Sequence, residues 1–481
     1  MTVVKKKYFY LLLCSCALAV SSCSDFLNEV SKSSLTPENS FSSSDDWNKA
    51  LSGAYGMLQF VFVGKQSITL NAFGTDEVEP FDLGWAAYNE LKIYTFSASH
   101  GFLREHYIWC YDGIKRANTI INMPADAPVP AGERESMIAQ AKFLRAIYYF
   151  DLVAMYGGVP MWLETSVDPD ALHKPRESAD AVYTQIVKDM SEAAAVLPVK
   201  WDEPGDKGRA TRYAAYSLLG RFYLQWGKSD EALGALNQVI GKYSLYDNYA
   251  DIFDPSHKNE EIENIFEVQF RHSGNWGLEG SLQSSYWGPR NVGGPTAGGG
   301  WGGFGPTQYL YDRYEQQDKR KQAFFATEYN GVPQTPPCIM KYRDPEYGTV
   351  IEDDQLNYIM MRYPDVLLMK AEALNNIDDK TDAKYECLNQ VRKRAGISLI
   401  TKEDGLTKEE FASVVLEERL RELCCEHHRR FDLLRFGKLA EQVRAAFPEI
   451  EVKPYHVLYP IPQDAIDGND MMTEADQNPG Y

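Results

Sequence analysis

The feature that most constrains the fold is a pair of helices predicted between residues 213 and 240. Large side chains recur there at helical spacing, and small residues stand among them at Gly220 and Ala232. Small residues at such positions let two antiparallel helices approach closely, while their large neighbours fill the space between them. The recurring positions are Tyr216, Leu219, Gly220, Tyr223, Ala232, Leu236 and Val239. A chain that contains this pair is predicted to be built from packed helices.

This spacing matches the tetratricopeptide repeat, a helical hairpin that stacks into arrays. A weaker copy runs from Leu367 to Cys387, and a long helix predicted over about 133–156 supplies half of another. That helix is predicted to end at Gly157-Gly158, because glycine is a common helix stop. Long segments separate the copies, so an interrupted array is predicted rather than a plain solenoid.

The first residues indicate export and anchoring. Three lysines at 5–7 precede an apolar stretch over 8–20, and Ser21-Ser22 then leads into Cys23. Charge and length fit a secretory signal that is too short for a membrane span. Small residues before a cysteine resemble a bacterial lipobox, in which the cysteine is acylated; the alternative is an ordinary signal peptide with a nearby free cysteine. The predicted divisions are a lipoprotein signal peptide over 1–22 and a lipidated tether over 23–44.

Composition excludes several classes of protein. Hydrophobic residues make up 44% and charged residues 24%, which excludes a largely disordered chain. The net charge of −19 argues against nonspecific nucleic-acid binding, because phosphates require a basic surface. The cysteines after Cys23 are odd in number and irregularly spaced, so a disulfide scaffold is not predicted.

The interval from 271 to 305 interrupts the helical pattern and is predicted not to be helical. It is rich in glycine between Gly293 and Gly305 and carries several large aromatic residues. A loop of this length in a compact protein is usually functional, and exposed tryptophans favour ligand binding. The candidate ligand-binding residues in this interval are Trp276, Tyr286, Trp287, Arg290 and Trp301.

A series of strings in a fixed order spans the chain from the lipobox to the last residue. They are CSDFL at 23–27, FLRAIYYFDLVAMYGGVPMWLE at 143–164, RYPDVLLMKAEALN at 362–375, LNQVRKRAGI at 388–397, ERLRELCCEHHRRFDLLRFGKL at 418–439 and YPIPQDAIDGNDMMTEADQNPGY at the end. Taken together, these strings closely resemble the SusD/RagB family of outer-membrane nutrient-binding lipoproteins.

The resemblance implies a mainly α, SusD-like fold, in which a tetratricopeptide-like scaffold carries long loop-rich insertions. The expected divisions are a single body over 45–481, helical repeats at about 103–240 and 360–440, and ligand-binding insertions at about 71–100 and 271–350. The resemblance also implies a lipid-anchored protein on the cell surface. Such a protein covers a SusC-like TonB-dependent transporter of the outer membrane and captures glycan, or sometimes peptide, before import.

A second candidate ligand-binding segment lies at 82–89, after Thr75-Asp76-Glu77, and is predicted to be a loop. Aromatic faces stack on the C–H faces of sugars, while Asp, Asn and Arg side chains bond their hydroxyl groups. The resemblance places a ligand-stacking aromatic at Trp85. The candidate ligand-binding residues in this segment are Asp82, Trp85, Tyr88 and Asn89.

No motif supports catalysis, a cofactor or a metal. Cys424 and His428 share a face if their segment is helical, but two ligands do not close a zinc site. Acidic pairs at 76–77 and 353–354 are more often solvated or capping groups than glycosidase carboxylates. We therefore predict a binding protein without catalytic residues. The alternatives are peptide binding by the same architecture, a surface glycosidase, and a tetratricopeptide module with protein partners alone.

Overall fold

The computed structural model describes residues 41–81, 85–165, 172–274, 280–292, 300–344 and 352–481. Helices dominate these ranges, and the strands form short antiparallel pairs. The predicted mainly α fold is therefore confirmed. Among the described helices, none is both long and apolar enough to cross a membrane.

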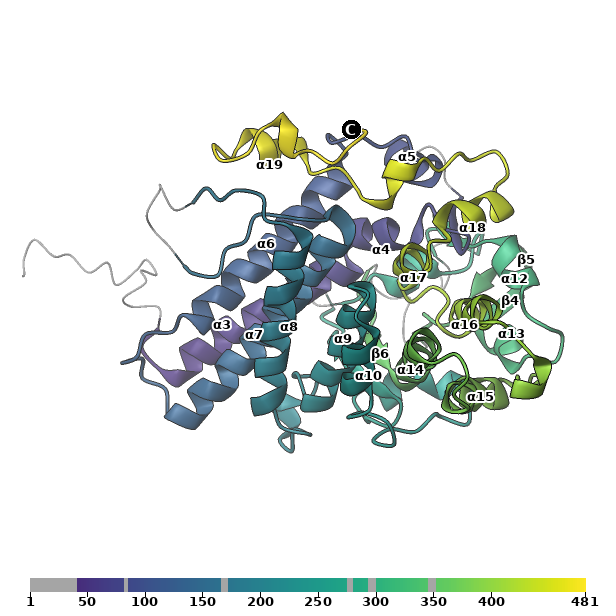
Figure 1. The fold of residues 1–481 in the computed structure, drawn as a ribbon, viewed down its shortest axis with the longest axis horizontal. Coiled ribbons are helices and arrows are strands. Elements are labelled where there is room, and N and C mark those ends of the chain that lie inside the picture. Colours follow the sequence, from purple (N-terminus) through teal and green to yellow (C-terminus); the bar gives the residue numbers. More distant parts are fainter. Residues whose placement is uncertain (1–40, 82–84, 166–171, 275–279, 293–299, 345–351) are drawn as a thin grey trace, which may run out of the picture.

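Four long helices lie side by side at one end of the molecule (Figure 1). They are α3 (Ser44–Leu58), α6 (Gly101–Ile121), α7 (Ala131–Tyr156) and α8 (Ala179–Val196). Every residue of α7 from 143 to 156 is buried, as expected for a helix packed on all sides. A Cβ atom at Gly113 of α6 would lie 2.5 Å from the ring of Tyr148, so glycine permits the close approach of α6 to α7. Helix α7 ends at Gly157, whose φ is +75°, which confirms the predicted stop.

The predicted helical pairs are confirmed in the second part of the scaffold. Helices α9 (Arg212–Gln225) and α10 (Ser229–Leu236) form the first pair, and α14 (Tyr363–Ile377) and α15 (Ala383–Ala395) form the second. A Cβ atom at Gly220 would lie 2.4 Å from Leu236, which explains the small residue at this position. Helices α16 (Lys408–Glu422) and α17 (Arg429–Arg435) pack beyond the second pair.

Shorter elements fill the remaining described segments. The strand pairs are β1 (Val78–Pro80) with β3 (Phe304–Pro306), β2 (Asn264–Val268) with β6 (Tyr358–Arg362), and β4 (Phe325–Tyr329) with β5 (Val332–Ile339). The helical elements are α4 (Lys65–Ala72), α5 (Ala86–Ile93), α11 (Gln283–Trp287), α12 (Gln308–Asp312), α13 (Lys319–Phe324), α18 (Leu439–Ala446), α19 (Gln463–Asp467) and a π-helical turn at Gln59–Val63.

Three local predictions are wrong. The segment after residue 85, predicted to be a loop, forms helix α5, and the interval 271–305 contains the short helix α11. The Cys424–His428 segment is not helical, because Cys425 and His427 have φ values of 61° and 65° and turn the chain between α16 and α17. A reversal of chain direction is needed there, and left-handed residues provide it.

A buried group of ion pairs joins β6, α15 and α16 to α13 and to Glu263, the residue before β2. This ionic cluster consists of Glu263, Arg320, Arg362, Arg394, Glu418, Glu422 and Glu426, whose side chains are at most 6% exposed. Arg362 contacts Glu263 at 3.0 Å, Glu422 at 2.6 Å and Glu426 at 2.8 Å. Arg394 contacts Glu422 at 2.6 Å. Arg392 and Arg394 belong to a basic run at 392–394 that, by its charge, would be expected at a solvated helix end, yet both are buried in ion pairs.

The last residues return across the scaffold and close the fold. The backbone N–H of Tyr459 donates to the carbonyl of Met155 at 2.8 Å. The side-chain amide of Asn478 donates to the carbonyls of Tyr156 and Tyr459 at 2.9 and 2.6 Å. Figure 1 shows α19 and the C-terminus along the edge of the molecule that also carries α5. The C-terminal segment therefore ties the end of α7 to this edge.

Candidate ligand-binding site

A short ribbon brings the two predicted ligand-binding segments together. Strands β1 and β3 pair in antiparallel register, with Val78 opposite Pro306 and Pro80 opposite Phe304. The backbone N–H of Phe81 extends the ladder by donating to the carbonyl of Gly303 at 2.7 Å. Because the chain runs out of β1 and into β3 at the same end, Phe81 and Gly303 lie together at the end of the ribbon nearest to Trp85 and Trp301 in the sequence.

The ribbon is fixed to the scaffold at its other end. The guanidinium of Arg429 in α17 donates to both carboxylate oxygens of Asp76, at 2.7 and 2.6 Å. The hydroxyl of Thr307 donates to the carbonyl of Asp76 at 2.7 Å, and its N–H donates to the carbonyl of Glu77 at 2.9 Å. Burial raises the pKa of Glu77 well above its usual range. Asp76 and Glu77 are therefore buried structural groups, not the solvated or capping groups that the sequence predicted.

Two exposed tryptophans occupy the free end of the ribbon. The side chain of Trp85 is 48% exposed and that of Trp301 is 51% exposed. The N–H of Trp301 donates to the carbonyl of Ser285 at 2.7 Å, which holds its backbone against α11. Large aromatic surfaces in water are costly unless they meet a partner, so this pair is the strongest ligand-binding feature among the described residues.

Tyr88 contacts both of the segments that carry the two tryptophans. Its ring stacks on Trp85 at a centroid distance of 5.3 Å, and its edge meets Phe304 at 6.1 Å. The Tyr88 side chain is only 3% exposed, so it supports Trp85 rather than offering a stacking face. An ion pair of 3.0 Å between Lys92 of α5 and Glu79 of β1 fixes the helix to the ribbon.

Arg290 lies on the opposite flank of the ribbon end. Its guanidinium stands 3.9 Å from the centre of the Phe81 ring, and it also donates to the carbonyl of Pro336. The backbone N–H of Arg290 donates to the Gln334 side chain at 2.9 Å. Burial lowers the pKa of Arg290 from its usual value, but an arginine remains charged at physiological pH. Arg290 was predicted as a ligand-binding residue, but its contact with Phe81, which places a half-buried cation at the ribbon end, was not.

The structure divides the remaining predicted residues into three groups. Asp82, Trp276 and the predicted lipidation site Cys23 lie outside the described residues. Asn89 is partly exposed on α5, and Tyr286 is partly buried, stacked on Phe304 at 5.9 Å with its hydroxyl 3.1 Å from Glu352. Trp287 is 1% exposed and packs edge-on against Phe304, so it belongs to the core and leaves the candidate set.

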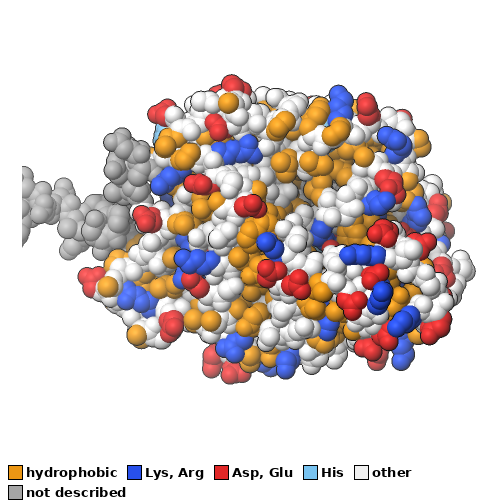
Figure 2. All heavy atoms as spheres, viewed as in Figure 1, with side chains coloured by type: hydrophobic (Ala, Val, Ile, Leu, Met, Phe, Trp, Pro, Cys, Tyr) orange, Lys and Arg blue, Asp and Glu red, His pale blue; other side chains and the backbone are white. Residues whose placement is uncertain are grey.

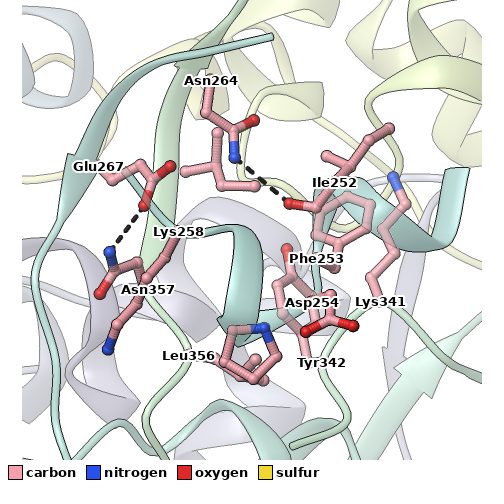
Figure 3. Close-up of a pocket in the computed structure, with 12 residues that line it drawn as sticks. Ile252, Phe253, Asp254, Lys258, Asn264, Glu267, Lys341, Tyr342, Leu356 and Asn357 are labelled. Carbon is pink, nitrogen blue, oxygen red and sulfur yellow. Dashed lines mark hydrogen bonds between the residues drawn. The ribbon is translucent and has the colours of Figure 1, made fainter. Parts of the chain in front are cut away.

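Two hollows among the described residues, of about 20 and 30 Å³, are too small to hold a sugar. One of them lies between β2 and the segments around Ile252 and Asn357 (Figure 3). There the Asn264 amide donates to the carbonyl of Ile252, and the Asn357 amide donates to Glu267. Its volume of about 20 Å³ accommodates about one water molecule. These two hollows therefore offer no room for a carbohydrate, whereas the two tryptophans lie at the surface.

Charged side chains of both signs are interspersed over the face of the molecule seen in Figure 2, with apolar side chains between them. That face carries no continuous field of a single sign. A mixed surface of this kind is typical of a soluble protein body and gives no electrostatic preference for a highly charged ligand.

Family models match both ends of the chain. A model described as "SusD family" matches residues 325–481, and one described as "Starch-binding associating with outer membrane" matches residues 25–224. SusD-like protein P25 from Formosa agariphila is 27% identical, and the match covers 96% of this chain and 97% of that protein. The relationship therefore extends over nearly the whole length of both proteins.

Solved structures superimpose over similar lengths. A laminarin-binding SusD-like protein gives a TM-score of 0.78 at 26% identity, covering 92% of this chain and 100% of that chain. A SusD homologue from Bacteroides thetaiotaomicron gives a TM-score of 0.81 at 21% identity, covering 92% and 98%. These superpositions confirm the predicted SusD-like fold.

Proposed function

Because this chain belongs to the SusD/RagB family, we propose that it binds oligosaccharide or polysaccharide at the cell surface and delivers it to a SusC-like TonB-dependent transporter. The observation that carries the binding part is the pair of exposed tryptophans, Trp85 and Trp301, at one end of the β1–β3 ribbon. Two such faces can stack on the C–H faces of sugar units, because the face of an aromatic ring is electron-rich.

The polar groups around the tryptophans suit hydroxyl recognition. Arg290 offers N–H donors that are partly exposed, and Asn89 offers both donors and acceptors on α5. Tyr286 adds a phenolic hydroxyl, which donates to Glu352 at 3.1 Å. We include Asp82 and Trp276 in the proposed site from the sequence alone. An extended, uncharged glycan is the ligand class that such a shallow aromatic surface fits best.

The proposed anchor is an acyl group on Cys23, followed by a polar tether over 23–44. A single acyl chain holds a protein to a membrane only marginally, so further acylation and the transporter contact would act together. Replacement of Cys23 by Ala is expected to move the protein from the membrane fraction to the soluble fraction. Retention of the variant in the outer membrane would contradict acylation at this residue.

Members of this family are binding proteins, which agrees with the prediction that the chain is not an enzyme. Peptide binding by the same architecture is the remaining alternative to glycan binding. Glycan binding and peptide binding differ in the class of ligand that contacts the two tryptophans. A test must therefore offer both classes to the same protein.

The decisive experiment is calorimetric titration of the mature protein with a panel of polysaccharides and peptides. The panel starts with laminarin and starch, because these glycans appear in the descriptions of a relative and of a family model. Trp85→Ala and Trp301→Ala should each weaken binding of the cognate glycan by at least about tenfold, or about 1.4 kcal/mol. Phe60→Ala is the matched control, because this aromatic side chain is 50% exposed outside the site.

Two results would overturn the proposal. If neither tryptophan variant changes the affinity for a glycan that binds, the ribbon end is not the site. If only peptides bind, glycan capture is wrong and the peptide alternative holds. Transport is tested separately, by asking whether a SusC-like TonB-dependent barrel co-purifies with the protein from its native outer membrane. Absence of such a barrel, with glycan affinity retained, would contradict delivery alone.

A further inference from the structure

A cluster of three potential metal ligands lies buried between α6 and α7. His106 and Cys110 stand one turn apart on α6, and Asp151 faces them from α7. One ligand atom from each residue lies within 4.8 Å of the other two. All three residues are at most 1% exposed. This is the one group of its kind among the described residues, and the sequence analysis did not consider it.

The spacing of the three atoms is close to that of a tetrahedral zinc site. His106 Nε2 lies 3.9 Å from Cys110 Sγ and 2.6 Å from Asp151 Oδ2. Typical zinc–ligand bond lengths put tetrahedral ligand atoms roughly 3.4–3.6 Å apart. The sulfur is therefore near its required place, and the His106–Asp151 contact has to open by less than about 1 Å. Small rotations of the two side chains achieve this without moving either helix.

The charge of the cluster favours a cation. Asp151 is a carboxylate in the core, and a buried charge requires compensation. A divalent ion bound to one carboxylate and one thiolate forms a neutral unit. Binding replaces the thiol proton of Cys110, which leaves to solvent, and requires the neutral His106 tautomer with its proton on Nδ1, so that Nε2 can coordinate.

A small hollow lies next to one of the three ligands, Asp151. Its volume of about 30 Å³ accommodates about one water molecule. Asn71 and His427 line the same hollow. The Asn71 Oδ1 atom and both ring nitrogens of His427 are buried and make no hydrogen bond to another described group. A water molecule in this hollow, beside Asp151, would meet hydrogen-bonding groups that otherwise have no partner.

We propose that His106, Cys110 and Asp151 bind a divalent transition-metal ion, with Zn²⁺ as the preferred ion, that clamps α6 to α7. Thiolate and imidazole ligands select this class over Ca²⁺ and Mg²⁺, which prefer oxygen. Because the site is buried between two scaffold helices, its role is structural, and it lies apart from the proposed glycan site. The alternative is a hydrogen-bonded His106–Asp151 pair that holds no metal.

The test measures metal in the mature protein produced in medium supplemented with Zn²⁺ or with Co²⁺. Elemental analysis and native mass spectrometry should find one equivalent of metal per chain. The Co²⁺ form should show the thiolate-to-cobalt charge-transfer band and the visible bands of a tetrahedral site. Chelation should lower the melting temperature of the wild type. If folded wild-type protein holds neither Zn²⁺ nor Co²⁺ at one equivalent per chain, the proposal is wrong, and no variant is needed to show this.

Variants then assign the site. Cys110→Ser should abolish the charge-transfer band and weaken Zn²⁺ retention at least about tenfold, and Asp151→Asn should weaken retention similarly. Cys424→Ser is the matched control, because Cys424 is also a fully buried cysteine but lies between α16 and α17. Circular dichroism shows whether each variant is folded. Retention of the full band in folded Cys110→Ser, or its loss in Cys424→Ser alone, would place the metal elsewhere and contradict the proposal.

Discussion

The α6–α7 interface and the region around α16 bury very different side chains. Between α6 and α7 the contacts are mostly apolar and aromatic, and Tyr148 fills the space beside Gly113. Around α16 the core contains charged groups, with Glu418 and Glu422 completely buried among arginines. Apolar packing requires matching volumes, whereas a buried ion pair requires each specific partner. The second region therefore depends more strongly on the identity of single residues.

The largest effect is expected from Glu422→Gln. This change removes a charge that compensates Arg362 and Arg394, and it leaves excess positive charge in the core. Loss of one partner of a buried pair costs about 3–5 kcal/mol, so the urea midpoint should fall markedly. Glu409→Gln on the exposed side of the same helix is the control. Equal midpoints for the two variants would show that the ionic cluster does not stabilise this region.

A somewhat smaller loss is expected from Gly113→Ala in the apolar region. The new methyl group would lie 2.5 Å from the Tyr148 ring, which is fully buried and donates to the carbonyl of Ala54. Overpacking of this kind costs about 1–3 kcal/mol. Gly56→Ala on α3 is the control, because a Cβ there meets no atom within 4 Å. If both substitutions leave the melting temperature unchanged, α6 and α7 are less tightly packed than described.

Acidification should weaken the fold near α17 before carboxylates protonate. Burial lowers the pKa of His427 to about 3, so the folded protein keeps this side chain neutral while the unfolded chain takes up a proton below pH 6.5. Stability is therefore lost as the pH falls from 6.5 towards 3, and the loss at pH 5 is about 2 kcal/mol.

The measurement is the urea midpoint of wild type and His427→Phe between pH 7 and pH 5. The variant removes the titrating group and keeps a ring against Tyr358, which stacks on His427 at 5.1 Å. Its midpoint should fall less steeply than that of the wild type. If the midpoint falls equally with pH in both proteins, His427 does not differ in protonation between the folded and the unfolded chain.

The smallest effect is expected at the surface. Lys402 and Asp382 form an ion pair of 3.1 Å, but their side chains are 62% and 71% exposed. Solvent screens such a pair, so Lys402→Ala should change stability by less than about 1 kcal/mol. The measurement is the urea midpoint at low and at high salt. A loss as large as that of Glu422→Gln would remove the distinction between buried and exposed pairs.

The same contrast explains what the sequence predicts and what it does not. The α9–α10 pair is predictable because Gly220 and Ala232 belong to a local, periodic pattern. The ionic cluster is not predictable in this way, because Arg394 meets Glu263, which lies 131 residues away. Periodicity treats a charged residue as solvated, so the arginines at 392 and 394 are assigned to the surface.

The candidate site shows a similar division. Its two segments are predictable from their tryptophans and glycines, but their meeting depends on the pairing of β1 with β3, two strands of only three residues each. Trp287 resembles Trp301 in sequence context, yet one is buried and the other exposed. Exposure is set by the tertiary fold, so composition cannot separate the two. The His106–Cys110 spacing of four residues was a visible signal for the cluster between α6 and α7, whereas Asp151 was not.

The two ends of the β1–β3 ribbon also differ in how freely their residues can be replaced. Its inner end is held by Arg429 and Thr307, whereas its outer end carries two tips, Phe81 with Trp85 and residues 300–303. The tip residues can be exchanged without disturbing the helices, because the β1–β3 hydrogen bonds and the contacts with Arg429 and Thr307 hold the ribbon in place. Grafting both tips together from one relative to another is thus a compact route to a new carbohydrate preference on an unchanged scaffold.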